Sequence, residues 1–251
     1  MFQNGTLSVL ISLLFVPFVA EAAFRGKGVE YGSDVSSSYG VQEVGVLLGS
    51  TTAVQEHLNT VIRRANWRMG GISNEEMLRA WEIGVQYGYR PLGSSIEWLL
   101  RPSYFYQKSA GSGSAGSFNY AVTSFMVFPM ARFIPLENNF MKFYTQFGIG
   151  YGRAYGKVEE ADASVEMQGD TYGTQLGVGL ELCYEASHCF GFETNYRVMK
   201  VARSLSTGIS GTFGSGSLSQ TATHSEVEFD GSDLVTQLGG LQLVLGYSAH
   251  F

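Results

Sequence analysis

Large apolar residues alternate strictly with small or polar residues along extended segments of this chain. In 141–157, Phe143 and Phe147 share one face, whereas Gly148 and Gly150 share the other. A period of two residues indicates a β-strand, because successive side chains point to opposite sides of the pleat. We find eight such segments, most of them as long as a tilted strand that crosses a bilayer: 41–50, 78–90, 95–106, 117–134, 141–157, 171–184, 189–203 and 234–251.

The connections between these segments alternate in length. Three are short, namely 91–94, 135–140 and 185–188, and four are long, namely 51–77, 107–116, 158–170 and 204–233. Short turns on one side and long loops on the other are typical of bacterial outer-membrane barrels, whose short turns face the periplasm. We therefore predict an all-β fold, an eight-stranded antiparallel up-and-down transmembrane β-barrel over 41–251.

A soluble barrel of the lipocalin kind is the alternative, because it also has eight alternating strands. Glycine and isolated glutamate make a poor water-facing surface but suit the narrow interior of an eight-stranded barrel. The large apolar face is therefore expected to point outward. The predicted outward aromatic residues form two belts, as expected at the two membrane interfaces: Tyr87, Tyr89, Phe143, Tyr184, Phe190, Phe192, Tyr247 and Phe251 at one end, and Trp81, Tyr155 and Tyr172 at the other.

The N-terminus carries the one long apolar run of the sequence. Leu7 to Val19 has the length of a signal-peptide core, and Ala20-Glu21-Ala22 matches an A-x-A cleavage site. We predict a signal peptide over 1–22 and an N-terminal periplasmic segment over 23–40. A buried N-terminal helix or a retained anchor is the alternative, because no Lys or Arg precedes the run.

The last segment ends in Leu245-Gly246-Tyr247-Ser248-Ala249-His250-Phe251, with Tyr247 and Phe251 on one face. This ending resembles the C-terminal signal of outer-membrane barrels, which the barrel-assembly machinery reads. The glycine-rich strand 143–152 and the hairpin 176–196 resemble the OmpA-like and OmpX-like eight-stranded superfamily. The resemblance covers about 41–251 as a pattern and implies a bacterial outer-membrane location. No C-terminal peptidoglycan-binding domain is expected after the barrel.

An outward apolar face turns nine charged residues inward. They are Glu43, Glu82, Arg90, Glu97, Arg101, Lys142, Glu181, Glu193 and Arg197. Charges inside a barrel must be paired or hydrated, since an isolated buried charge is very unfavourable. We expect a network of ion pairs that fills the lumen; a narrow or gated path for ions is the alternative.

Two cysteines, Cys183 and Cys189, flank a short turn with inward parity. They are candidates for a disulfide, which an oxidising periplasm permits. These two residues and the nearby His188 provide too few ligands to predict a metal site, and no cofactor is predicted.

The long loops offer two candidate sites. Arg63, Arg64 and Arg68 cluster beside Trp67 in a stretch with partial helical spacing, and guanidinium groups can bind lipopolysaccharide phosphates. An ordinary mixed surface is the alternative. His224-Ser225-Glu226 is the nearest approach to a hydrolase triad, but it lies in a Ser/Thr/Gly-rich loop without a rigid support, so no enzymatic activity is expected.

Two prolines, Pro102 and Pro129, interrupt the third and fourth segments. A closed barrel has no free edge for proline, so we expect bulges or strand ends there. The facing of 124–130 is ambiguous, because both of its faces are apolar.

The net charge of −6 argues against nucleic-acid binding. We expect a structural or surface-interaction barrel whose partners are outer-membrane lipid and lipopolysaccharide, with the assembly machinery during biogenesis. A small channel or transporter for ions or small solutes is the alternative.

Overall fold

The computed structural model describes residues 42–251, apart from 69–71, 115, 139, 186, 216 and 220–221. The predicted signal peptide and periplasmic segment lie outside the described residues. Eight antiparallel strands form a closed barrel, because β6 also pairs with β7 and completes the ring. The predicted fold class is confirmed. In spatial order the strands are β1 (Gln42–Thr51), β2 (Ala80–Tyr89), β3 (Ile96–Gly113), β4 (Gly116–Glu137), β5 (Met141–Glu160), β6 (Ala163–Glu185), β7 (His188–Val201) and β12 (Gly240–His250).

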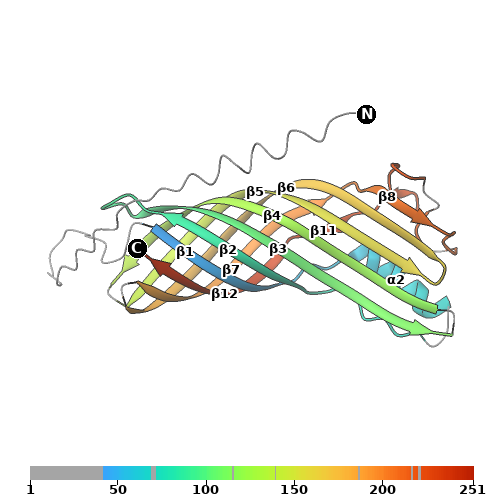
Figure 1. Ribbon diagram of the computed structural model, residues 1–251, viewed down its shortest axis with the longest axis horizontal. Coiled ribbons are helices and arrows are strands. Elements are labelled where there is room, and N and C mark those ends of the chain that lie inside the picture. The colour runs from blue at the N-terminus through green and yellow to red at the C-terminus, as the bar shows by residue number, and fades with distance from the viewer. Residues whose placement is uncertain are drawn as a thin grey trace. The chain divides into compact units, whose positions relative to one another are not determined.

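The two ends of the barrel differ (Figure 1). One end carries the short turns after β2, β4 and β6 together with the C-terminus, and we call it the turn end. The other end, the cap end, carries α2 and β8. The elements inserted there are α2 (Glu56–Arg68), β8 (Leu205–Ser210), β9 (Glu228–Phe229), β10 (Ser232–Asp233) and β11 (Thr236–Gln237). None of the helical structure in the described part of the chain is long and apolar enough to cross a membrane.

The outward face of the barrel carries a continuous apolar band. Every outward position of β2 from Trp81 to Tyr89 and of β7 from Phe190 to Val198 is exposed, and most carry aromatic or aliphatic side chains. Exposure of so much apolar surface is unfavourable in water but favourable in lipid. We call this surface the belt; it includes Val44, Val46, Leu48, Trp81, Ile83, Val85, Tyr87, Tyr89, Phe143, Phe147, Ile149, Tyr172, Leu176, Val178, Phe190, Phe192, Leu241, Leu243, Leu245, Tyr247 and Phe251.

Four strands continue well beyond the belt. The predicted loops 107–116 and 158–170 are mostly strand, since β3 and β4 meet at Gly113 and Gly116 and β5 and β6 meet at Glu160 and Ala163. The loop prediction was wrong because serine, glycine and charged residues in these stretches suggested solvent-exposed turns. Backbone pairing with the neighbouring strand holds them extended.

Beyond the belt, toward the cap end, the two faces of the strands exchange polarity, so that apolar side chains point inward and polar ones outward. Val158 of β5 points inward and is fully buried, whereas Lys157 and Glu159 point outward. The inward side chains pack with an apolar face of α2, which buries Leu58, Val61, Ile62 and Ala65, and with apolar residues of the loop that precedes β12, including Leu218, Val227 and Phe229. We call α2, the segment 203–238 and the strand ends 107–122 and 156–170 the cap.

The two strand prolines are accommodated without the expected bulges. The β2–β3 register is the same on both sides of Pro102, and the β4–β5 register is the same on both sides of Pro129. At each proline the ladder instead loses two residue pairs, because proline has no N–H to donate. In the β4–β5 pair the register shifts at Phe133/Leu136, near the turn end.

Candidate functional site

The barrel interior below the cap, which we call the lumen, is organised around Arg132 of β4. Its Nη1 lies 3.2 Å from Glu43, 3.1 Å from Glu97 and 3.2 Å from Glu181. Its Nη2 lies 3.4 Å from Glu193. These carboxylates come from β1, β3, β6 and β7, so one buried cation joins strands from all around the ring.

The Arg132 guanidinium also lies over an aromatic ring. Its central carbon is 4.0 Å from the centroid of Tyr144 on β5, and the Tyr144 hydroxyl donates a hydrogen bond to Glu193 at 2.9 Å. Gly179 gives this ring its space, because a Cβ there would collide with the Tyr144 phenol. The inward glycine therefore has a packing function. The sequence alone showed only that small residues alternate with large ones along this strand.

Two further arginines make bidentate pairs toward the cap end. Arg101 donates to both oxygens of Glu193 at 2.7 and 2.9 Å, and Arg197 donates to both oxygens of Glu82 at 3.0 and 2.9 Å. Paired geometry of this kind gives strong, directional hydrogen bonds. Polar side chains complete the shell: Gln146 and Asn195 donate to Glu193, Gln242 donates to Glu82, and Gln86 accepts from Arg101.

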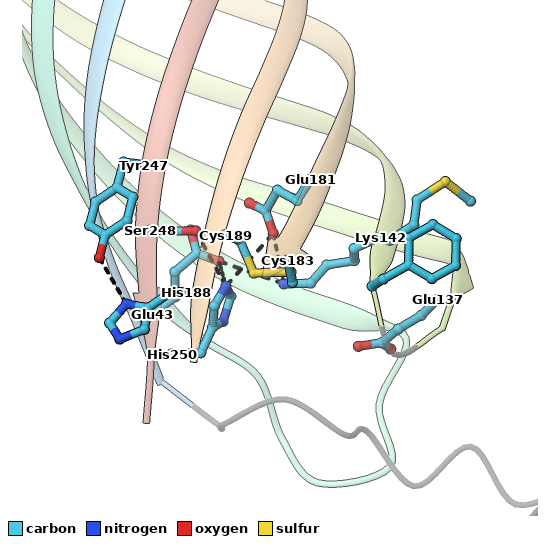
Figure 2. Close-up of a disulfide and its surroundings, with 12 residues drawn as sticks. Glu43, Glu137, Lys142, Glu181, Cys183, His188, Cys189, Tyr247, Ser248 and His250 are labelled. Carbon is cyan, nitrogen blue, oxygen red and sulfur yellow. Dashed lines mark hydrogen bonds and ion pairs between the residues drawn. A yellow bond between two sulfur atoms is a disulfide. The ribbon is translucent and has the colours of Figure 1, made fainter. Parts of the chain in front are cut away.

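The turn end holds the remaining predicted charges, Arg90 and Lys142. Arg90 makes a bidentate pair with Glu137 at 2.9 and 2.6 Å. The Lys142 Nζ lies 2.9 Å from Glu181 (Figure 2). The nine predicted lumen residues are thus all buried, and all have opposite charges as neighbours.

Two buried charges of the lumen, Arg132 and Glu137, were not predicted from the sequence. Both follow the stretch 124–130, where inward Met126 and Phe128 alternate with outward Phe125 and Val127, so apolarity does not identify the face. The available signal was register: Glu97 lies opposite Arg132 in the β3–β4 ladder, which is the cross-strand pairing of opposite charges that stabilises a hairpin.

Two small cavities lie in the lumen, one beside Glu181 and one beside Glu82, with volumes of about 10 Å³ each. That volume is near the lower limit for one water molecule. Counting the described lumen charges, six carboxylates (Glu43, Glu82, Glu97, Glu137, Glu181 and Glu193) face five cations (Arg90, Arg101, Arg132, Lys142 and Arg197).

The three arginines of α2 are all engaged with acids. Arg63 lies 3.0 Å from Glu76, and Arg68 lies 3.3 Å from Glu160. Arg64 donates to both oxygens of Asp230 at 2.8 and 2.7 Å and so lowers the pKa of that exposed carboxyl. The neighbouring Trp67 is 87% exposed. These pairs tie α2 to Glu76, to Glu160 of β5 and to the loop 204–233, which supplies Asp230.

Buried polar contacts also join α2 to the strands. The Tyr120 hydroxyl donates to Glu160 at 2.8 Å, and Glu160 in turn accepts from Arg68. Burial and the adjacent Glu160 raise the pKa of Tyr120, so its hydroxyl stays protonated as a donor.

His224, Ser225 and Glu226 do not form a catalytic arrangement among the described contacts. The Ser225 hydroxyl donates to the Ala222 carbonyl at 2.6 Å, and Glu226 pairs with Arg203 at 2.8 Å. His224 has a positive φ of 66°, which turns this segment back on itself.

The two cysteines form a disulfide across the β6–β7 turn. Cys189, Glu181 and His250 also have potential ligand atoms within 4.8 Å of one another, and in the oxidised protein the Cys189 sulfur is bound to Cys183.

A closed antiparallel barrel with an apolar belt and a charged interior defines the class of transmembrane β-barrels. No protein-family model and no curated protein matches the sequence. Solved structures do match in fold. The outer membrane protein OprG from Pseudomonas aeruginosa aligns with a TM-score of 0.52 at 11% identity, over 85% of this chain and 97% of that chain. A major outer membrane protein from Thermus thermophilus aligns with a TM-score of 0.51 at 11% identity, over 84% of this chain and 99% of that chain. The chain therefore has the fold of bacterial outer-membrane barrels.

Proposed function

We propose that this outer-membrane barrel is a non-conducting protein with a structural or surface-interaction role. The observation that carries the proposal is the Arg132 cluster, which occupies the lumen with ion pairs from β1, β3, β4, β6 and β7. An eight-stranded barrel has an interior just wide enough for side chains to fill. An ion crossing this lumen would have to separate buried pairs, and each separation leaves an uncompensated charge.

The cap supports the same proposal at the other end. Leu58, Val61 and Ile62 of α2 are fully buried against the strand ends, so a second, apolar layer lies above the charged one. On the outward side the cap presents Trp67 and several paired charges. This ordered surface is the part of the protein that we propose to contact partners outside the cell.

Single-channel recording in planar bilayers tests the non-conducting state. Folded wild-type protein, checked by the change of its gel mobility on boiling, is expected to give no conductance steps. A variant with the loop 51–77 shortened is expected to stay silent as well, because the Arg132 cluster remains below the cap. Regular conductance steps from the wild type would instead support the small channel that the sequence left open.

We also propose that the protein has no enzymatic activity. The support is that Ser225 and Glu226 bond to Ala222 and Arg203 and not to His224. Lipid A profiles of cells carrying Ser225→Ala or His224→Ala are expected to match the wild type. A changed profile would contradict this proposal.

Two partner proposals rest on the outer surface. Tyr247 and Phe251 are both outward and exposed at the end of β12, which supports recognition of this strand by the barrel-assembly machinery. Phe251→Ser is expected to lower the yield of heat-modifiable protein in membranes, whereas Phe140→Ser, at an exposed turn, is not.

Lipopolysaccharide phosphates are proposed to contact Arg63, Arg64 and Arg68. Each guanidinium has five N–H donors, so an ion pair with one carboxylate does not use them all. Replacement of all three by Ala is expected to weaken lipopolysaccharide binding in a detergent titration. Arg203→Ala is the control, because Arg203 is also an exposed cap arginine paired with acids. Equal binding by the triple variant would remove the proposal.

A further inference from the structure

The disulfide at the turn end lies among side chains that bind metals in other proteins. Cys183 and Cys189 are directly opposite each other in the β6–β7 ladder, and Glu181 precedes Cys183 by two residues, on the same inward face. His250 comes from β12, the next strand, where Ser248 is the register partner of Cys189. Figure 2 shows the Glu181 carboxylate and the His250 imidazole on either side of the disulfide. Ligand atoms of Glu181, Cys189 and His250 lie within 4.8 Å of one another.

We propose that reduction of this disulfide creates a site for a thiophilic divalent cation of the Zn²⁺ class, with Cys183, Cys189, His250 and Glu181 as its four ligands. Two thiolates, an imidazole and a carboxylate are all established zinc ligands, and four ligands match the tetrahedral preference of that ion. The oxidised protein lacks the site because both sulfurs are engaged in the S–S bond.

The redox step is a thiol–disulfide exchange with a dithiol reductant. One thiolate of the reductant attacks a protein sulfur and forms a mixed disulfide, and its second thiolate then displaces the protein sulfur. The protein S–S bond gains two electrons and two protons and becomes two thiols, while the reductant becomes a disulfide. Cys183 is the more accessible residue, at 8% exposed, whereas Cys189 is fully buried.

Charge balance favours the metal in this buried place. A disulfide is neutral, and a divalent cation bound to two thiolates adds no net charge, because the two thiols release two protons on binding. Exchange of one for the other therefore leaves the balance of the lumen unchanged. A divalent cation without the thiolates, or two thiolates without a cation, would be an uncompensated buried charge and therefore unfavourable there.

The neighbouring contacts hold the ligands in place. Glu181 accepts from Arg132 at 3.2 Å through Oε1, which leaves Oε2 on the side of Lys142 and His250. The Lys142 Nζ is also 3.9 Å from Glu43, so it keeps a carboxylate neighbour when Glu181 binds the cation. The Nε2 of His250 is 3.3 Å from the Ser248 hydroxyl, a contact that a metal can replace. Such outer contacts orient metal ligands.

Reduction is compatible with a folded barrel. The disulfide joins residues six positions apart, and the entropic stabilisation from such a short loop is at the low end of the usual range. The β6–β7 ladder continues from Cys183 to Gly173, and β7 also pairs with β12. The strands that carry the ligands are thus held together without the S–S bond.

Cobalt binding tests the proposal. The full chain is folded in detergent, freed of any histidine tag, reduced with a phosphine that has no thiol, and titrated with Co²⁺ in the absence of oxygen. The reduced protein is expected to bind about one Co²⁺ with thiolate-to-metal and tetrahedral absorption bands, and Zn²⁺ is expected to displace it. The oxidised protein is expected to show neither band.

Variants assign the ligands. Cys183→Ser with Cys189→Ser is expected to abolish the thiolate band, and His250→Gln or Glu181→Gln is expected to weaken binding about tenfold or more. His188→Gln is the matched control, because His188 is next to Cys189 but exposed, with its Nδ1 2.8 Å from the Tyr247 hydroxyl. Three results would overturn the proposal: no cobalt bands from reduced protein that keeps its heat-modifiable mobility, equal binding by His250→Gln, or loss of the barrel on reduction.

Discussion

The lumen and the cap are built from the same strands but have opposite interiors. In the belt-level half of β5, the inward residues include Lys142, Tyr144 and Gln146, and the outward residues include Phe147 and Ile149. In the cap half of the same strand, inward Val158 is apolar and outward Lys157 and Glu159 are charged. The parity of the strand does not change between the halves. The inward face changes from polar to apolar, and the outward face changes from apolar to charged.

The difference follows from the medium outside the barrel. Where lipid surrounds the strands, the outward face must be apolar, and the narrow interior can hold polar groups that satisfy one another. Where water surrounds them, the hydrophobic effect acts as in a soluble protein, and apolar side chains gather inside around α2. The residues at which the polarity of the two faces inverts therefore mark the membrane boundary on the cap side of the barrel.

The two interiors are expected to respond differently to mutation. A network of buried charges is specific in geometry and is disrupted strongly when one member is removed. An apolar core loses stability in proportion to the volume deleted. Four experiments test this contrast between lumen and cap, and the first is expected to give the largest change.

Arg132→Ala is expected to have the largest effect. It leaves Glu43, Glu97 and Glu181 without their shared cation, and loss of one partner from a buried pair typically destabilises by about 3–5 kcal/mol. Urea unfolding of the protein in lipid vesicles, followed by gel mobility, measures the change. Arg153→Ala removes an arginine that is 42% exposed and pairs with Asp170, and is expected to cost less than about 1 kcal/mol. Equal losses in both variants would refute the special role of the Arg132 cluster.

Ile62→Ala tests the apolar interior of the cap. Ile62 is fully buried in α2, and such a truncation typically costs about 2–5 kcal/mol. We expect faster hydrogen exchange and proteolysis in α2 and 222–238, with the urea midpoint of the barrel unchanged. Trp67→Ala, at a side chain 87% exposed on the same helix, is the control and is expected to change little. A lower barrel midpoint for Ile62→Ala would mean that lumen and cap unfold as one unit.

Ile149→Lys compares the cost of an outward lysine in the belt with its cost in the cap, on the same face of β5. Ile149 is 57% exposed, and a lysine on the lipid face near the bilayer centre costs about 2–4 kcal/mol. Glu159→Lys puts the same side chain on the same face of β5 in the cap, where water surrounds it, and is expected to cost under about 1 kcal/mol. Vesicle unfolding measures both. Similar costs would place the membrane boundary elsewhere on β5.

The pH dependence of the Arg64–Asp230 pair is expected to be the smallest effect. Arg64 holds the pKa of Asp230 below its ordinary value of 3.8, so the pair stabilises the cap above that pH and the contribution is lost as pH falls through the lowered pKa. Carboxyl carbon shifts of Asp230 measured against pH are expected to give a higher pKa in Arg64→Met. Arg63→Met is expected to leave the titration unchanged. An unaltered titration in Arg64→Met would show that the pair does not form in solution.

Much of the fold could be predicted because it depends on local alternation. Lipid outside and limited space inside require a period of two, and this is visible in β5 and β6 without any knowledge of their neighbours. The same alternation predicted nine lumen charges and predicted that Cys183 and Cys189 share one face. The predictions failed for strand segments in which the two faces have similar polarity. Arg132 was missed because 124–130 is apolar on both sides, and the strand ends 107–113 and 163–170 looked like loops because their outward faces meet water.

The number of barrel strands and the choice of outward face follow from the amino-acid sequence alone, because each depends on the surrounding medium and on residues one or two positions apart. The tertiary structure was needed to show which charges meet, that Arg132 joins four carboxylates, and that α2 packs against an inverted apolar interior. These features depend on register between strands far apart in sequence. They also depend on the closure of the ring, which brings β1, β6 and β7 around one guanidinium.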